Sequence, residues 1–236
     1  MNSMGDLDLL GLEMDLLWGP DLFGRPVAPH PLIAVADAGE GRVVRFDPAI
    51  PKETRAQLEA LVASGTIDQT DASDSPLLIA TSSRAPIALR SGGGPSFVMR
   101  GDEVAPTAPF RILDSDGPLT HRPIRPGAWG DDEEWEELLD GRLGPWAAAL
   151  LGERTVGVCY TPVASLRSAE AGVWTDPIVR GRGCAPLVTA AWAAVARRSF
   201  DTLFYSTSFE NEASQAVARK LGLRPLGTIR QLWLPD

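Results

Sequence analysis

The sequence of 236 residues contains only two cysteines and two histidines, and it has no long hydrophobic run. Cys159 and Cys184, with His30 and His121, are too few to supply a structural zinc cage or a disulfide framework, so we expect no metal site. No run approaches the roughly 18 to 20 apolar residues of a membrane span. The first 18 residues alternate Leu with Asp and Glu and carry no basic leader, unlike a secretion signal. These absences favour a cytoplasmic protein.

Acidic residues outnumber basic ones, with 31 Asp and Glu against 22 Lys and Arg and a formal net charge of −9. The balance differs along the chain, because residues 170–236 carry a net charge of +2 and the preceding part −11. A nucleic-acid-binding protein presents a basic face, so this balance argues against that class. The acidity attracts a cationic ligand or serves solubility alone, and residues 131–134 (DDEE) fit both interpretations.

Turn residues and periodicity divide the chain into three predicted parts. Residues 1–30 are rich in Leu, Asp, Gly and Pro and predict an irregular N-terminal segment. Residues 31–115 predict a smaller α+β lobe, and residues 120–236 a second domain. The density of Pro, Asp and Gly between residues 102 and 126 is typical of a linker between them.

Short apolar runs and turn residues define the elements of the predicted N-terminal lobe. It has a hairpin, a helix and two further strands, at residues 32–36, 42–46, 51–65, 77–80 and 97–99. The run Gly92-Gly93-Gly94 lacks the Lys-Ser/Thr and the helix that follow a nucleotide-binding loop. We therefore interpret it as a plain flexible loop.

In the second domain, apolar runs and turn residues predict a helix, three strands, a helix, a strand, a helix and a strand, in that order. Their expected positions are 131–139, 146–151, 155–160, 171–175, 186–198, 203–207, 211–221 and 226–234. Glycine at position 222 is typical of a helix end, and asparagine at position 211 of a helix start.

Residues 179–185 (VRGRGCA) follow the third of these strands and precede a helix that is expected to begin with Pro186. The first N–H groups of a helix lack partners and carry partial positive charge, so they stabilise an anion. Gly181 and Gly183 allow close approach of the backbone, and Arg180 and Arg182 add charge and planar donors. The segment predicts a phosphate site, although an ordinary strand-to-helix turn also uses such glycines.

The order of elements, with RGRGCA after the third strand and NEASQAVARKLGL after the next, resembles the GNAT superfamily of acyl-CoA-dependent N-acyltransferases. The resemblance covers about residues 120–236. It implies an α/β fold of the α+β type, with a mixed, mostly antiparallel sheet flanked by helices. It also implies acyl transfer, most simply of acetyl, from acetyl-CoA or another acyl-CoA to a primary amine by direct attack in a ternary complex. The acceptor would be a small molecule, and the acidic charge suits a cationic one.

The resemblance assigns cofactor-binding positions residue by residue. The pyrophosphate of coenzyme A would be bound by a turn, the pantetheine arm by a strand, and the arm again by the start of the last helix. These positions are Arg180, Gly181, Arg182, Gly183, Cys184 and Ala185; Val173, Trp174 and Thr175; and Asn211 and Ser214. Asn211 and Ser214 also fit simple helix capping. Cys184 is interpreted as a packing residue.

The sequence departs from the family's pattern at the position of the proton donor. The family's N-x-x-A-x-x-L-Y-x-K-L-G-F pattern has a tyrosine where this sequence has Ala218. Tyr205 is the candidate general acid, with Tyr160 the only other tyrosine, and it also fits a strand residue packed in the sheet. Ser206 or Ser208 through a water is another route.

Glu170 is the candidate general base, because it directly precedes the strand of the thioester pocket. An exposed carboxylate at a strand end is the alternative interpretation. His121 near the expected linker is a further candidate base or a solvated side chain.

Two other functional hypotheses stay open. The absence of the expected tyrosine suits an acyl-CoA-binding regulatory module without turnover, and an open acidic groove would suit a protein amine as acceptor. The oligomeric state is open, with a homodimer as one arrangement.

Overall fold

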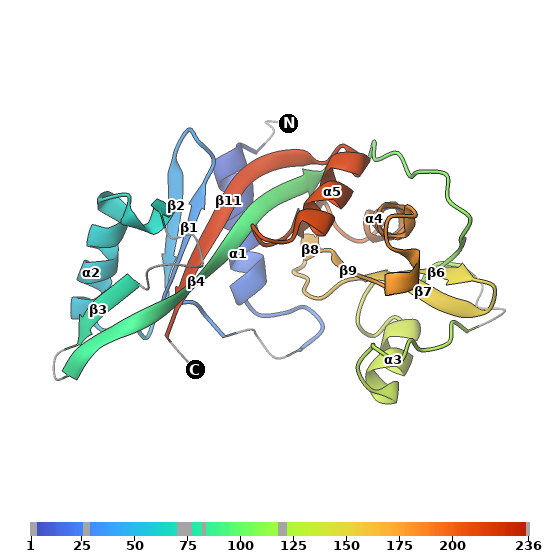
Figure 1. Cartoon of the computed structure of the whole chain (residues 1–236), viewed down its shortest axis with the longest axis horizontal. Coiled ribbons are helices and arrows are strands. Elements are labelled where there is room, and N and C mark those ends of the chain that lie inside the picture. The colour runs from blue at the N-terminus through green and yellow to red at the C-terminus, as the bar shows by residue number, and fades with distance from the viewer. Residues whose placement is uncertain (1–3, 26–28, 70–76, 82–83, 118–121, 235–236) are drawn as a thin grey trace.

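The computed structural model describes residues 4–25, 29–69, 77–81, 84–117 and 122–234. Short runs of strands are separated by helices along the chain (Figure 1). The helices are α1 (Asp6–Trp18), α2 (Lys52–Ala63), η1 (Thr66–Gln69), α3 (Asp132–Leu139), η2 (Pro177–Val179), α4 (Cys184–Ala196) and α5 (Glu212–Leu221). The strands are β1 (Ile33–Asp37), β2 (Arg42–Phe46), β3 (Leu77–Thr81), β4 (Arg84–Met99), β5 (Arg111–Asp114), β6 (Ala147–Leu151), β7 (Arg154–Tyr160), β8 (Ser168–Glu170), β9 (Gly172–Thr175), β10 (Thr202–Ser206) and β11 (Arg224–Trp233).

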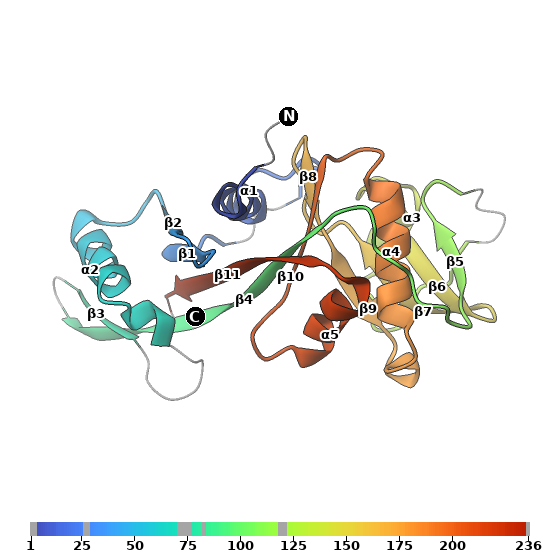
Figure 2. The ribbon, with the colours of Figure 1, turned by 90° about the horizontal axis from the view of Figure 1, so that it is seen from above.

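The strands form two sheets. The larger has the order β2-β1-β11-β4-β10-β8, with β3 paired to β4, and the smaller has the order β5-β6-β7-β9. Every pairing is antiparallel except that of β8 with β10. In Figure 1, β4 and β11 run side by side across the molecule, and in Figure 2 α1 and α5 lie on opposite sides of them. The predicted mixed, mostly antiparallel α+β fold is confirmed.

The two sheets meet where β8 ends and β9 begins. Residues of β8 pair with β10, and the last bond of this run is the Ala171 N–H to the Phe204 carbonyl at 3.0 Å. From Gly172 onward the chain pairs with β7 instead. The chain therefore leaves one sheet and joins the other within a few residues, and β9 and the end of β10 diverge.

The predicted elements of the second domain are present with small shifts in their ends. The last helix is capped by the Asn211 side chain, which accepts the Ser214 N–H at 3.0 Å, and it ends at Gly222 with φ 65°. The helix expected to begin with Pro186 begins at Cys184, because Gly183 adopts φ 82° and caps it. Proline fits in this first turn, where its missing N–H would have no partner.

The N-terminal segment expected to be irregular contains α1, and this prediction was wrong. Leu10, Met14 and Trp18 of α1 are buried, and α1 packs against β1, β11 and β8. Its apolar stripe is interrupted by Glu13, which is itself fully buried. The stripe was therefore hard to recognise in the sequence as one face of a helix.

The predicted lobe of residues 31–115 does not have a sheet of its own. β4 lies between β10 and β11 of the second domain, and β1 pairs with β11. β5, at the end of the expected lobe and inside the expected linker, pairs with β6 of the second domain. Pairing between strands so distant in sequence leaves no local signal.

The glycine run is part of β4, so its interpretation as a flexible loop was wrong. A Cβ on Gly93 would lie 2.2 Å from the Ile229 carbonyl oxygen of β11, and one on Gly94 would lie 1.8 Å from the Thr207 carbonyl oxygen. A Cβ on Gly92 would lie 3.0 Å from the Trp233 ring. These glycines allow the backbones of β11 and of the segment after β10 to approach closely.

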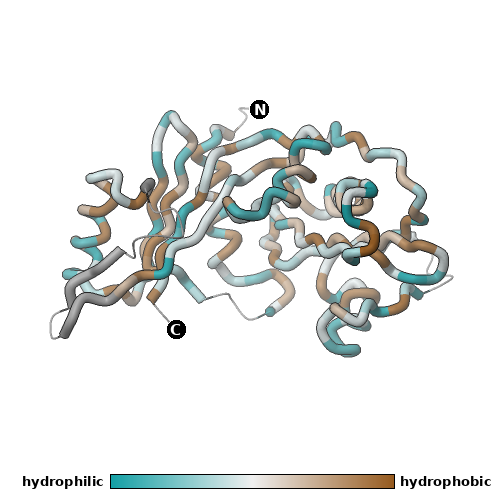
Figure 3. Tube along the Cα trace, in the orientation of Figure 1, coloured by the Kyte–Doolittle hydropathy of each residue, from teal (hydrophilic) through white to brown (hydrophobic). Residues whose placement is uncertain are grey.

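Buried side chains form clusters under each helix. The largest lies between α4, α5 and the strands, and the others lie under α1, α2 and α3. α3 is dominated by hydrophilic residues (Figure 3), and only Trp135, Leu138 and Leu139 of this helix are buried. Among the described helices, none is long and apolar enough to cross a membrane.

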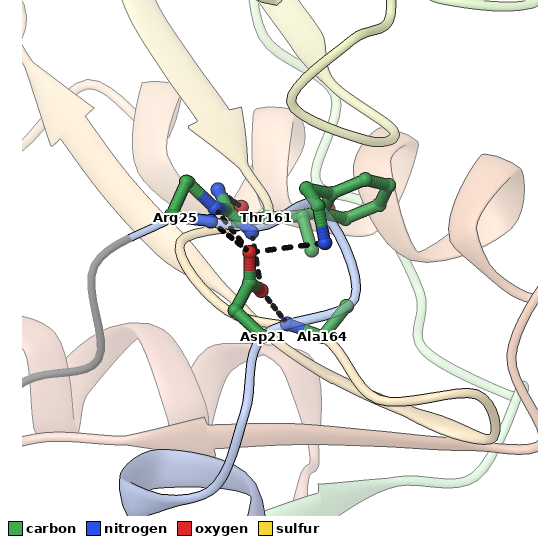
Figure 4. A network of polar contacts seen from close by, with 5 residues as sticks. Asp21, Arg25, Thr161 and Ala164 are labelled. Atoms are coloured by element: carbon green, nitrogen blue, oxygen red, sulfur yellow. Dashed lines mark hydrogen bonds and ion pairs between the residues drawn. The ribbon is translucent and has the colours of Figure 1, made fainter.

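A polar network joins the segment after α1 to the loop after β7 (Figure 4). Asp21 accepts hydrogen bonds from the Arg25 side chain at 2.9 Å and from the Ala164 N–H at 2.9 Å. The Arg25 guanidinium also donates to the Thr161 carbonyl. Burial alone would raise the pKa of Asp21, but these hydrogen bonds outweigh it and lower the pKa. The network fixes the end of α1 beside the second domain.

Candidate active site

Glu170 lies at the point where the two sheets diverge. One oxygen of its carboxylate accepts hydrogen bonds from the Ser206 N–H at 2.7 Å and from the Ser206 hydroxyl at 2.9 Å. The Ser206 N–H thus donates to a side chain at the point where the pairing of β10 with β8 has ended. The sequence left open whether Glu170 is an exposed strand-end residue; with 5 % exposure it is buried.

Burial raises the pKa of Glu170 to about 7, against the opposing effect of the hydrogen bonds from Ser206. A carboxyl group with such a pKa is partly ionised at neutral pH and can accept a proton there. Burial, together with the charge of Glu170, also raises the pKa of Glu13. The Glu13 carboxylate accepts a hydrogen bond from the Ser96 hydroxyl. Neither Glu13 nor Ser96 was predicted as a site residue.

The segment from Arg180 to Cys184 is a turn between η2 and α4, as the sequence predicts. Gly181 and Gly183 have φ values of 75° and 82°, in the left-handed region that favours glycine. Among the described residues, the N–H groups of four residues have no hydrogen-bond partner: Gly181, Gly183, Cys184 and Ala185. The helix start and these free donors form a concave group suited to an anion.

The two arginines of this turn are exposed. The Arg182 guanidinium lies 5.9 Å from the centre of the Phe110 ring, and neither Arg180 nor Arg182 forms an ion pair with a described residue. Their charges are therefore available to a ligand. The diphosphate of coenzyme A fits these donors and this charge.

Cys184 is a packing residue, in agreement with its interpretation from the sequence. It is 2 % exposed, and burial raises the pKa of its thiol to about 11. A Cβ on Gly157 of β7 would lie 2.6 Å from its sulfur. The contribution of Cys184 to a phosphate site is limited to its backbone N–H.

Three predicted pantetheine-binding residues lie on β9, the edge strand of the smaller sheet. Val173, Trp174 and Thr175 are partly buried and pair with Cys159, Val158 and Gly157 of β7. The other side of the β9 backbone has no strand partner among the described residues, so an extended ligand can pair there. Trp174 borders a pocket of about 510 Å³ that Arg125 and Arg154 also line.

Tyr205 and Ser214 are in contact, although the sequence placed them in different roles. The Tyr205 phenol oxygen lies 2.6 Å from the Ser214 hydroxyl oxygen. Tyr205 is buried in the same cluster as Ala218, and burial raises the pKa of its phenol to about 12. Tyr160, the alternative phenol, packs against Trp129 with ring centres 4.9 Å apart.

The remaining candidates differ in position. The Asn211 carboxamide caps α5, as expected for a helix start. The Ser206 hydroxyl donates a hydrogen bond to Glu170. Ser208 lines the same pocket as Ser206. His121 lies outside the described residues.

Comparison with known proteins relates part of the chain to a family. The family model of the acetyltransferase (GNAT) domain matches residues 117–224. This part of the chain is similar to acetyltransferases of that family, as the sequence motifs indicated, and the part before residue 117 lies outside the match.

One solved structure with a TM-score above 0.5 shows the same fold at low identity, and two others are less similar. A GCN5-related N-acetyltransferase from Kribbella flavida is 15% identical with a TM-score of 0.54, over 99% of this chain and 97% of that chain. A GNAT-family acetyltransferase from Colwellia psychrerythraea is 12% identical with a TM-score of 0.48, over 100% and 98%. A GCN5-related N-acetyltransferase-like protein from Streptococcus suis is 17% identical with a TM-score of 0.39, over 62% of this chain and 63% of that chain. The chain thus spans less than two thirds of the Streptococcus suis protein. No curated protein matches the sequence.

Proposed function

We propose that the protein transfers an acyl group, most simply acetyl, from acyl-CoA to a primary amine by direct attack in a ternary complex. The observation that carries this proposal is the position of Glu170, a buried carboxylate at the end of β8, where β9 diverges from β10. A base at this point can reach an acceptor that enters between the strands. Its pKa of about 7 suits proton transfer at neutral pH.

The cofactor-binding part of the proposal rests on the turn and on β9. The free N–H groups of Gly181, Gly183, Cys184 and Ala185 and the charges of the two arginines would hold the diphosphate. The unpaired side of β9 would hold the pantetheine arm, and an N–H group there would donate to the thioester carbonyl oxygen. When bound, acyl-CoA supplies the activated carbonyl and a thiolate leaving group.

The protons are handled by residues on either side of the sheet divergence. Glu170 would accept a proton from the acceptor ammonium, which frees the lone pair of the nitrogen for attack. Tyr205, bonded to Ser214 at the start of α5, would return a proton to the departing thiolate. Ser214 is only half-buried, so it can connect the buried phenol to a ligand in the opening between the strands.

The test is release of free thiol from acetyl-CoA in the presence of a panel of primary amines, with the full chain. We expect thiol release that depends on the amine, and N-acetylated product in equal amount. Coenzyme A binding by calorimetry without any amine-dependent release from short acyl-CoAs would instead identify a binding module. Glu170→Gln should lower kcat about 100-fold or more while coenzyme A binding is retained.

A further inference from the structure

Two serines on neighbouring strands hold two buried carboxyl groups. Ser96 of β4 lies directly opposite Ser206 of β10 in the antiparallel register. Side chains of directly opposed residues lie on the same face of a sheet, about 5 Å apart. The Ser96 hydroxyl donates to Glu13 of α1, and the Ser206 hydroxyl donates to Glu170 of β8. The register therefore brings the carboxyl groups of Glu13 and Glu170 together on the face covered by α1.

Each of these carboxyl groups has one oxygen without a donor. The Oε2 atom of Glu13 and the Oε1 atom of Glu170 are hydrogen-bonded, whereas Oε1 of Glu13 and Oε2 of Glu170 are buried and have no partner among the described residues. Buried acceptors in this state are costly and are normally satisfied. An ammonium group carries three donors and a positive charge, so a single one can satisfy both oxygens.

A pocket of about 180 Å³ lies beside Ser206, whose hydroxyl donates to Glu170. Leu17, one helical turn after Glu13 on the same face of α1, lines it as well. Gly94 and Gln231 complete much of the wall, and none of the described lining residues is basic. The pocket therefore brings a small amine as far as Ser206, next to Glu170, without a competing cation.

We propose that Glu13 and Glu170 together bind the ammonium group of the acceptor, and that the acceptor is a small aliphatic primary amine that arrives as a cation. This inference rests on the proposed function, because Glu170 is the base in both. Glu170 takes one proton from the ammonium, the freed lone pair forms the C–N bond, and the C–S bond breaks. The electron pair of that bond leaves with sulfur, which takes a proton from Tyr205; the phenol regains a proton from the second N–H of the new amide nitrogen, and the proton on Glu170 passes to solvent. Glu13 acts as a binding residue contributed by α1.

The groups that face this pair stay neutral near pH 7. Tyr205 of β10 and Cys159 of β7 both sense the charge of Glu170, and burial raises the pKa of each. Neither therefore competes as an anion for the ammonium, and among these four groups only the carboxyl pair can supply negative charge.

The test uses n-butylamine as acceptor and compares Glu13→Gln with Asp15→Asn. Asp15 is an exposed carboxylate two residues away on α1, paired with Arg45, and it serves as the matched control. We expect Glu13→Gln to raise KM for n-butylamine about 10- to 100-fold, because one charged hydrogen bond is lost. The KM of acetyl-CoA should stay unchanged, and Asp15→Asn should behave as the wild type. Equal KM values for n-butylamine in the two variants would overturn the proposal.

A second measurement separates this inference from the proposed function. Calorimetry with n-butylamine alone reports the carboxyl pair without any acyl transfer. Binding by the wild type that is lost in Glu13→Gln and retained in Glu13→Asp supports the pair, even if the protein proves inactive with acetyl-CoA. Amine-dependent transfer with wild-type KM in both Glu13 variants leaves the transferase in place and rejects the pair. The Glu13→Asp variant also keeps the test decisive if Glu13→Gln fails to fold.

Discussion

The phenol oxygen of Tyr205 lies 2.6 Å from the hydroxyl oxygen of Ser214, one helical turn before Ala218. Tyr205 belongs to β10, and its ring packs in the same buried cluster as residues of α5. The sequence lacks a tyrosine at position 218, and the small side chain there belongs to the same buried cluster as the Tyr205 ring. A phenol from the neighbouring strand is thus brought to the start of α5, where the proposed thiolate would leave.

Replacing Tyr205 by Phe should lower kcat by about tenfold or more, because the phenol proton is lost while the ring remains. Tyr160→Phe is the matched control, since Tyr160 is the only other tyrosine and packs against Trp129. Steady-state rates with acetyl-CoA and an amine provide the measurement. Wild-type kcat in Tyr205→Phe, with kcat reduced in Tyr160→Phe, would assign the role to the other phenol.

The raised pKa of Glu170 predicts how stability changes with pH. The folded-state pKa of about 7 exceeds the usual value of 4.5, so the folded protein binds more protons than the unfolded chain between these values. Its contribution is fully present below pH 4.5 and is lost as pH rises through 7. We expect Glu170→Gln to reduce the loss of unfolding free energy between about pH 5 and about pH 8 by roughly 1–3 kcal/mol.

Urea denaturation at the two pH values measures this difference. Glu210→Gln is the control, because it removes a carboxylate that is exposed rather than buried. The expectation fails if the two variants show the same dependence on pH.

Asp21 is expected to anchor the N-terminal helix through its network with Arg25 and Ala164. Asp21→Ala should lower the unfolding free energy by about 1–3 kcal/mol, because a half-buried guanidinium and a buried N–H lose their acceptor. The folded-state pKa of Asp21 is lowered, so its contribution is present above the usual pKa and is lost as pH falls through the lowered one. Asp201→Ala is the control, since its ion pair with Arg167 is exposed and contributes little. Equal thermal midpoints for the two variants at pH 7 would contradict this role.

The local elements of the second domain could be predicted because their signals are local. Asn211 and Gly222 mark the two ends of α5 within the helix itself. Glu13 could not be found in this way, because its partner Ser96 is 83 residues away in the sequence. The insertion of β4 between β10 and β11 also depends on distant pairing. The turn at residues 180–185 was therefore recognised, whereas the carboxyl pair required the structure.

The glycines of β4 give a test of the close approach that the sequence did not reveal. Gly94→Ala should destabilise the protein by about 2 kcal/mol or more, because the new Cβ would lie 1.8 Å from the Thr207 carbonyl oxygen and force the backbone to move. Gly127→Ala is the control, since its Cβ meets no described atom within 4 Å and its φ is not positive. Differential scanning calorimetry of both variants is the measurement. A Gly94→Ala protein as stable as Gly127→Ala would show that the segment after β10 does not pack on β4.

The turn between η2 and α4 predicts where coenzyme A binds. The double variant Arg180→Ala with Gly183→Asp removes one positive charge and adds a negative one beside the free N–H groups, so coenzyme A affinity should fall about 10- to 100-fold or more. Its fold should survive, because Arg180 is exposed and a Cβ on Gly183 meets its nearest atom at 3.6 Å, at a cost of about 1–2 kcal/mol for the left-handed backbone.

A matched control makes the same changes elsewhere. Arg167→Ala with Gly152→Asp alters the net charge equally and also replaces a left-handed glycine, whose φ is 64°, at a turn with no atom within 4 Å of the new Cβ. Calorimetric titration of coenzyme A into both double variants is the measurement, with thermal midpoints to confirm folding. If the variant of the turn binds coenzyme A as tightly as the control, the diphosphate lies somewhere else. The free N–H groups of Gly181, Gly183, Cys184 and Ala185 would then need another anion as their partner.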